Sequence, residues 1–162
     1  MSIQVQQVTN RADLKRWAKV PYGLYEGNPY YIPRLFSDEL AYFDRRKNPA
    51  FEISNVKLLL AIDNQRLLGR VCGIVNSLEA KKLGYKRGRF GWFVCVNDQQ
   101  VADLLLDSAK DWCREVGCAE MTGPQGFTDL DVEGLLIEGF DHLPTISGSY
   151  NHPYYQKLIE NY

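Results

Sequence analysis

A nearly continuous apolar run at residues 56–62 is followed by the turn sequence Asp63-Asn64-Gln65 and by a second apolar run at residues 67–75. Apolar runs of this length, joined by a few turn-forming residues, are typical of neighbouring antiparallel strands in a sheet interior. A third run at residues 89–96 is rich in aromatic and β-branched side chains and predicts another strand. We therefore expect a meander of three sequential antiparallel strands, which argues against a doubly wound dinucleotide-binding fold.

The clearest helical pattern follows directly, at residues 97–117. Asn97 and Gln100 resemble a capping box, and Gly117 stands where a C-terminal glycine belongs. Apolar residues recur through this segment at helical spacing, so one face should pack against the sheet. The residues expected on that buried face are Leu104, Leu105, Trp112 and Val116.

The remaining segments complete a mixed architecture. We expect a first strand at residues 3–8, a helix that Asn10 caps and that ends near Pro21, and a second helix capped by Ser37. Residues 78–83 suggest a short helix or turn, and a strand at 118–122 precedes a long loop at 123–148. Pro153 then opens a last helix. The order predicts an α/β (α+β) domain over residues 1–162, with a mostly antiparallel sheet and helices on both faces.

Composition narrows the class of partner. The chain has 162 residues, 19 basic and 20 acidic, and a net charge of -1, which calls for neither a nucleic-acid nor a membrane partner. One basic and aromatic stretch at residues 81–90 suits a solvated strand edge more than a phosphate-binding surface. The N-terminus lacks the basic and apolar segments of a signal peptide, and no apolar run approaches the ~20 residues that span a bilayer.

The metal-ligating residue types do not form a recognisable site. The four cysteines, Cys72, Cys95, Cys113 and Cys118, include no C-x-x-C pair and lie far from both histidines in sequence. We therefore expect reduced thiols in a cytoplasmic protein, and no metal. The sequence Asp129-x-Asp131-x-Glu133-Gly134 echoes the first half of a calcium loop, but Phe140 stands at its twelfth position, so we interpret it as a solvated loop.

Several sequence strings point to a known family. Residues 60–69 form an apolar strand, an acidic turn and a return strand with glycine; residues 90–117 give a strand and a long helix; Asn151 leads the last helix. This order resembles the Gcn5-related N-acetyltransferase (GNAT) fold. The strings DRRKNPAFE, GPQGFTDLDVEGLLIEGFD and YNHPYYQKLIENY are similar to a bacterial group of GNAT-like proteins of poorly defined function. Members of that group are longer, so the resemblance implies an N-terminal half and a C-terminally incomplete domain that lacks the two final strands.

The resemblance also implies where acetyl-CoA would bind. In the family, the pantetheine arm pairs with the strand before the long helix, and a turn of the pattern Q/R-x-x-G-x-G/A holds the pyrophosphate on helix N-terminal amides. Here the turn has no glycine and no basic residue, and Asp98 adds a like charge. We expect weak or absent acetyl-CoA binding; an ordinary capped core helix and a cofactor site with unusual ligands are both consistent with this turn. The matching residues are Phe93, Val94, Cys95, Val96, Asn97, Gln99, Gln100 and Val101.

The catalytic residues that the resemblance implies are displaced. The family's tyrosine acid falls on Leu158, so Tyr154 and Tyr155 are the candidates, unless both are packing aromatics. Glu133 is our candidate general base, with Glu52 and Glu138 as further carboxylates. These residues suggest an acyl-CoA N-acyltransferase acting on a small-molecule amine. The alternative is a catalytically silent binding or assembly module, completed by a homo-oligomer or by a missing C-terminal half.

Overall fold

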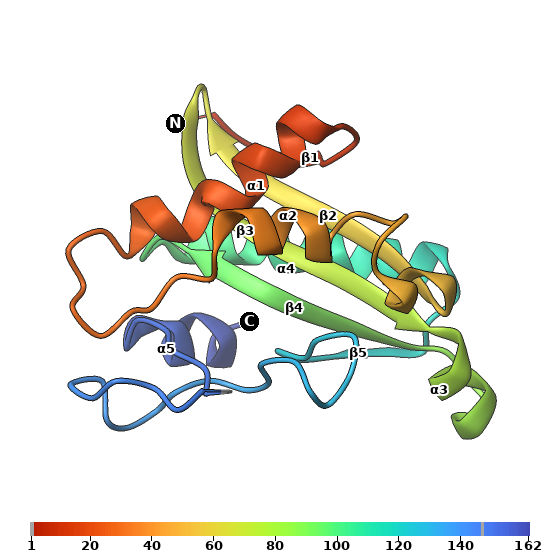
Figure 1. Cartoon of the computed structure of the whole chain (residues 1–162). Helices are drawn as coiled ribbons and strands as arrows, with labels where there is room; N and C mark the ends of the chain where they lie inside the picture. The colour runs from red at the N-terminus through yellow and green to blue at the C-terminus, as the bar shows by residue number, and fades with distance from the viewer. Residues whose placement is uncertain (1, 147) are drawn as a thin grey trace.

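The computed structural model describes residues 2–146 and 148–162, which form one five-stranded sheet with helices on both faces (Figure 1). Along the chain the elements are β1 (Ile3–Gln7), α1 (Arg11–Leu24), α2 (Phe36–Tyr42), the 3-10 helix η1 (Pro49–Glu52), β2 (Ser54–Asp63), β3 (Arg66–Asn76), α3 (Ser77–Leu83), β4 (Arg87–Cys95), α4 (Gln99–Glu115), β5 (Glu120–Thr122) and α5 (Tyr154–Glu160). None of the helices in the described residues has the length and hydropathy that crossing a membrane requires.

The sheet has the predicted meander at its centre. Strands β1 to β4 are sequential antiparallel neighbours, and β5 adds to β4 in parallel. Asn64 turns the β2–β3 hairpin with φ 55°, a conformation that asparagine tolerates better than most residues. The prediction that residues 56–62, 67–75 and 89–96 form adjacent antiparallel strands is confirmed.

The helices divide between the two faces of the sheet. Helices α1 and α2 lie across one face and α4 lies across the other, so the sheet is buried on both sides (Figure 1). Trp17 of α1 and Leu105 of α4 are both fully buried, on opposite faces. This burial explains why β2 and β3 read as continuous apolar runs instead of alternating ones.

Helix α4 confirms the predicted element but shifts its details. It begins at Gln99, and Asp98 is the cap, because its carboxylate accepts a hydrogen bond from Gln100 N; Asn97 lies outside the helix. Leu105 and Trp112 are buried as predicted, whereas Leu104 and Val116 are only half-buried. The helix phase is set by the sheet: a Cβ added at Gly73 would lie 2.8 Å from the Trp112 ring, so glycine makes room for the indole.

Two predicted helix boundaries were wrong. Helix α1 continues through Pro21 to Leu24. Because proline has no N–H, the Trp17 carbonyl loses its helical partner, and Arg70 Nη1 from β3 donates to that oxygen at 3.3 Å instead. Ser37 does not cap α2: Leu35 occupies the cap position without a side-chain bond, and the Ser37 hydroxyl bonds to Asp38.

The four cysteines lie where the apolar runs placed them. Cys72, Cys95 and Cys113 are buried and Cys118 is half-buried, and none of the four takes part in a disulfide. Burial raises the pKa of the Cys95 thiol to about 12, so this sulfur stays protonated and chemically inert at neutral pH.

Candidate functional site

Strands β4 and β5 pair briefly and then separate. Their pairing covers Arg87 to Arg89 of β4 and stops at Thr122 of β5. The chain then turns close under β4, where Gln125 N donates to Phe90 O at 2.8 Å. A Cβ added at Gly91 would lie 2.2 Å from Gln125 O, so this approach requires glycine. Beyond this point the outer edge of β4 has no neighbouring strand within the described residues.

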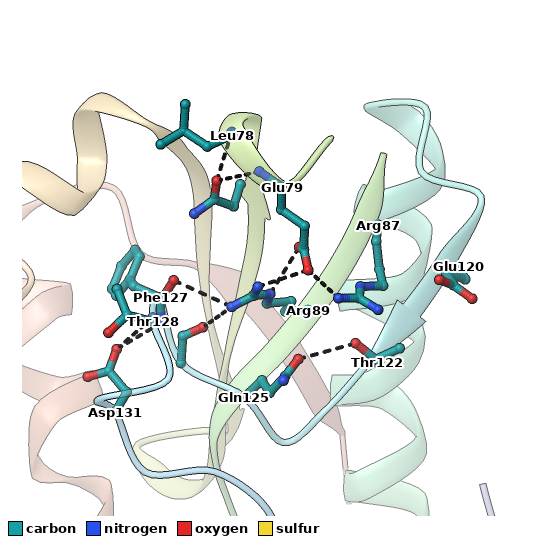
Figure 2. Close-up of polar contacts among 12 residues, drawn as sticks. Leu78, Glu79, Arg87, Arg89, Glu120, Thr122, Gln125, Phe127, Thr128 and Asp131 are labelled. Carbon is teal, nitrogen blue, oxygen red and sulfur yellow. Dashed lines mark hydrogen bonds and ion pairs between the residues drawn. The ribbon is translucent and has the colours of Figure 1, made fainter. Parts of the chain in front are cut away.

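A polar cluster fixes the loop that follows β5 (Figure 2). Arg89 of β4 donates from Nε to Glu79 Oε2 at 3.1 Å and from Nη1 to the carbonyl of Gly126 at 3.2 Å. On the other side of the loop, Asp131 Oδ2 accepts from the amides of Phe127 and Thr128, at 2.9 and 3.2 Å. Asp131 belongs to the stretch that resembles the first half of a calcium loop, and its carboxylate instead holds the turn at Phe127 and Thr128. No group of three or more metal-ligating side chains gathers anywhere in the described residues.

A cavity of about 460 Å³ opens where the two strands diverge. Its walls come from the chain just after α1, from α2 and the segment before it, from β3 and the end of β4, and from the loop between β5 and α5 together with α5 itself. A β-bulge shapes the β4 wall: the register with β3 shifts between Arg70 and Cys72, and Trp92 adopts φ 49°. Most of the lining is aromatic or aliphatic, including Tyr25, Tyr31, Trp92, Phe93, Leu135 and Tyr150.

A buried ion pair lines the same cavity. Arg70 Nη1 of β3 lies 2.6 Å from Glu39 Oε1 of α2, and the two side chains are only 6% and 4% exposed. The Arg70 guanidinium also stacks over the Trp17 ring, 4.2 Å from its centroid. Neither residue was predicted from the sequence as part of a site. The available signal was an arginine inside the apolar run at 67–75, because a charge in a buried strand requires a partner.

Helix α5 closes the free edge of β4. Tyr155 Oη accepts a hydrogen bond from Cys95 N at 2.8 Å, and the Tyr154 hydroxyl donates to Cys95 O, also at 2.8 Å. Val96 N bonds to Leu68 O of β3, so these Cys95 groups face away from β3, toward the edge that β5 has left. Figure 1 shows α5 beside β4. Tyr154 and Tyr155, predicted as catalytic, thus meet Cys95, predicted as cofactor-binding.

The contacts of α5 make this closure firm. Tyr155 is 1% exposed, its ring packs edge-on against Phe93, and burial raises its pKa well above the ordinary value. Tyr154 is less enclosed, and burial raises its pKa to about 12. Buried Asn151 holds the loop before the helix, because its side-chain oxygen accepts from Leu136 N at 2.7 Å. Both phenols are therefore neutral hydrogen-bonding groups at physiological pH.

The start of α4, where the resemblance places the pyrophosphate, is also engaged. Asp98 Oδ1 accepts from Gln100 N at 2.9 Å, which consumes one of the helix's free amides. Gln99 Nε2 donates to Asp103 and to Leu158 O of α5, at 2.8 and 3.0 Å. Of the other residues predicted to bind the cofactor, Phe93, Val94 and Val101 are buried, Val96 is half-buried, and Asn97 is exposed.

The predicted general base lies elsewhere. Glu133 is exposed and lines a shallow pocket of about 330 Å³ with Arg87 and Gln125, next to the main cavity. Glu52 and Glu138 are exposed and do not line the main cavity. Among the described residues that line this cavity, Glu39 is the one carboxylate. The structure thus brings Tyr155 to the cavity and both tyrosines to Cys95, but it places Glu133 in the neighbouring pocket.

No protein-family model matches the chain. Two curated bacterial proteins are similar to it over nearly its whole length. Protein YghO of Escherichia coli K12 is 30% identical over 156 residues, which cover 96% of this chain and 40% of YghO. A bacterial ceramide synthase of Caulobacter vibrioides is 29% identical over 159 residues, which cover 98% of this chain and 41% of that protein. The chain therefore spans about two fifths of the length of either relative.

Solved structures share the fold at low sequence identity. A tandem GNAT protein from the clavulanic acid biosynthesis pathway aligns with 99% of this chain and 43% of its own, with a TM-score of 0.64 and 12% identity. A probable acetyltransferase aligns with 98% of this chain and 87% of its own, with a TM-score of 0.55 and 20% identity. The chain is therefore a GNAT-like protein in its fold, similar to part of longer bacterial relatives.

Proposed function

We propose that this chain is an N-acyltransferase-type domain of GNAT fold whose own acetyl-CoA site is degraded, and which serves as one half of a larger acyltransferase-like protein. The observation that carries the proposal is the occupation of the Cys95 backbone groups by Tyr154 and Tyr155. A pantetheine arm that paired with this edge of β4 would have to displace both phenols. Tyr155 is almost completely buried, so its displacement would also require α5 to move.

The pyrophosphate end supports the same conclusion. A phosphate-binding helix start offers free amides and partial positive charge. Here Asp98 occupies one amide and adds a negative charge at that end of α4. Glycine is absent from the turn, so the backbone cannot close on an anion as the family pattern allows. Both ends of the cofactor groove are thus unfavourable for acetyl-CoA.

The relatives suggest the reaction class of the larger protein. One of them is named a bacterial ceramide synthase, and a ceramide is an amide formed from an amine and a fatty acyl group. N-acylation of an amine is therefore the reaction that we propose for the complete protein. The alternative is an active acyltransferase in this chain, with acyl-CoA bound after α5 swings away from β4.

Titration calorimetry of the purified chain with acetyl-CoA separates these two possibilities. We expect no saturable binding in the micromolar range for the wild type. A thermal-shift measurement provides a second readout, because a ligand at a hundredfold its Kd would stabilise the fold by ~2.7 kcal/mol.

A micromolar Kd that is abolished by Gln99→Trp, which crowds the start of α4, would show that the acetyl-CoA site is intact. The degraded-site proposal would then be wrong, and the chain would be an enzyme in its own right. Tyr85→Phe is a matched control, because Tyr85 is exposed and its hydroxyl bonds to Glu120, away from α5.

A further inference from the structure

We propose that Glu39 and Arg70 form the acceptor-positioning site of the cavity, in which Glu39 Oε2 accepts a hydrogen bond from an amine or hydroxyl group of the ligand. The proposal deepens the N-acyltransferase assignment, on which it depends only for describing the ligand as an acceptor. Neither residue was identified from the sequence as functional.

The two carboxylate oxygens of Glu39 have different surroundings. Arg70 Nη1 is engaged by Glu39 Oε1 at 2.6 Å and by the Trp17 carbonyl at 3.3 Å. Glu39 Oε2 has no hydrogen-bond partner in the part of the chain that the structure describes. This oxygen is not fully enclosed, and Glu39 lines the cavity. One carboxylate oxygen is therefore held by Arg70, while the other is available to a ligand.

The pair also has unsatisfied hydrogen-bonding capacity. The Arg70 side chain is only 6% exposed, and its Nε is enclosed without a hydrogen-bond partner within residues 2–146 and 148–162. A buried ion pair recovers its desolvation cost only when further hydrogen bonds satisfy its remaining groups. Arg70 Nε is out of a ligand's reach, so Glu39 Oε2 is the group of the pair that a ligand in the cavity can complete, and such a ligand would offset part of the cost of burying the pair.

The surroundings of the pair select the chemistry of the ligand. The charged side chains lining the cavity, within the described residues, are Arg34, Glu39 and Arg70, so the wall carries one more positive than negative charge. The group that meets Glu39 Oε2 is a hydrogen-bond donor, either a hydroxyl or an amine in its ammonium form, whereas a carboxylate has no donor to offer. The ammonium form would have to lose a proton before acyl transfer, because only an uncharged amine is nucleophilic. Tyr31 lies near the pair, and burial raises its pKa to about 12, so its phenol stays neutral.

Three probes of one length test the proposal without any cofactor: hexylamine, 1-hexanol and hexanoate. Binding is followed by NMR through the three tryptophan indole signals. Trp92 lines the cavity and Trp17 contacts Arg70, whereas Trp112 packs in a separate cluster on the opposite face and serves as an internal reference. We expect hexylamine and 1-hexanol to shift the Trp92 and Trp17 signals, and hexanoate to bind at least tenfold more weakly.

The decisive variant is Glu39→Leu/Arg70→Met, which replaces the ion pair with apolar side chains. Such replacements are often neutral or stabilising, but this one also removes the Arg70 bond to the Trp17 carbonyl, so its folding is checked first. The double variant should lower the affinity for both donor probes at least tenfold. Should this variant not fold, Glu39→Gln gives the second test, since it should weaken hexylamine binding more than 1-hexanol binding. Glu115→Gln, an exposed carboxylate on α4, is the matched control and should change nothing.

Unchanged donor affinity in the folded double variant, tighter binding of hexanoate, or no probe binding to the wild type would each overturn the proposal. Because no acetyl-CoA is present, these outcomes are independent of the calorimetric test of the degraded cofactor site.

Discussion

At the scale of single residues, two glycines differ in whether their position requires glycine. Gly91 lets two backbone segments approach closely, whereas Gly23 lies in a helix, where alanine is the more favourable residue. A Cβ at Gly91 would meet Gln125 O at 2.2 Å, whereas a Cβ at Gly23, in the last turn of α1, would meet nothing within 4 Å. We expect Gly91→Ala to destabilise the fold by about 1–3 kcal/mol, because the loop under β4 must move. Gly23→Ala should instead stabilise it by about 0.5–1 kcal/mol. Urea denaturation of both variants measures the difference, and equal effects would contradict the described loop position.

The residue scale is also where the sequence was least informative. The cofactor turn could be examined position by position because the family resemblance supplied a pattern for it. Glu39 and Arg70 are 31 positions apart, and no local pattern links α2 to β3. Only the fold brings them together, as it brings Tyr155 to Cys95 across 60 positions. Long-range pairs of this kind cannot be read from propensity or periodicity, since both describe short windows of sequence.

At the scale of elements, the sequence predicted the meander and the long helix α4, because turn residues and apolar periodicity are local signals. The helix boundaries were less predictable for a specific reason. Pro21 is a valid stop signal in isolation, and only Arg70, from another element, makes its interruption of α1 tolerable. The phase of α4 was also misjudged at Leu104, because glycines on the sheet decide which side of the helix can approach it.

The docking of α4 gives a prediction at this scale. Trp112 is 9% exposed and packs with Val75 and Cys113 over the space left by Gly73. Trp112→Ala should lower the free energy of unfolding by about 3–5 kcal/mol, because the indole leaves a cavity that the sheet cannot fill. Arg114→Ala, which breaks an exposed ion pair on the same helix, should cost less than about 0.5 kcal/mol. Chemical denaturation compares the two, and a small effect of Trp112→Ala would show that the indole is not enclosed in solution.

The docking of α5 should be visible in the alkaline pH dependence of stability. Burial raises the folded-state pKa of Tyr155 above the value of about 10 expected in the unfolded chain. Its contribution to stability is therefore complete below pH 10 and is lost as the pH rises toward the folded-state pKa. In Tyr155→Phe, the fall in the free energy of unfolding above pH 10 should be shallower by up to about 1.4 kcal/mol per pH unit. Identical slopes in the variant and the wild type would indicate that α5 is not docked on β4.

At the scale of the whole molecule, the exposed apolar side chains are unevenly distributed. Among the described residues, the segment between β5 and α5 holds five of the twelve exposed large hydrophobic side chains: Leu130, Val132, Ile137, Leu143 and Ile146. The same segment contains five acidic residues and no lysine or arginine: Asp129, Asp131, Glu133, Glu138 and Asp141. Exposed apolar side chains favour association, while the uniform negative charge of the segment opposes its association with a second copy.

The balance between these two effects gives the last prediction, which concerns the expected self-association. At low ionic strength, charge repulsion between two copies of the segment should keep the chain monomeric. Added salt screens that repulsion, because the Debye length falls from ~10 Å at 0.1 M to ~3 Å at 1 M, and leaves the apolar contact intact. Sedimentation velocity should therefore show association that strengthens as sodium chloride is raised. Leu130→Ser/Ile137→Ser should abolish it, whereas Leu78→Ser, at an exposed position on α3, should not. Association that weakens with salt, or that persists in the double variant, would place the contact on another surface of the protein.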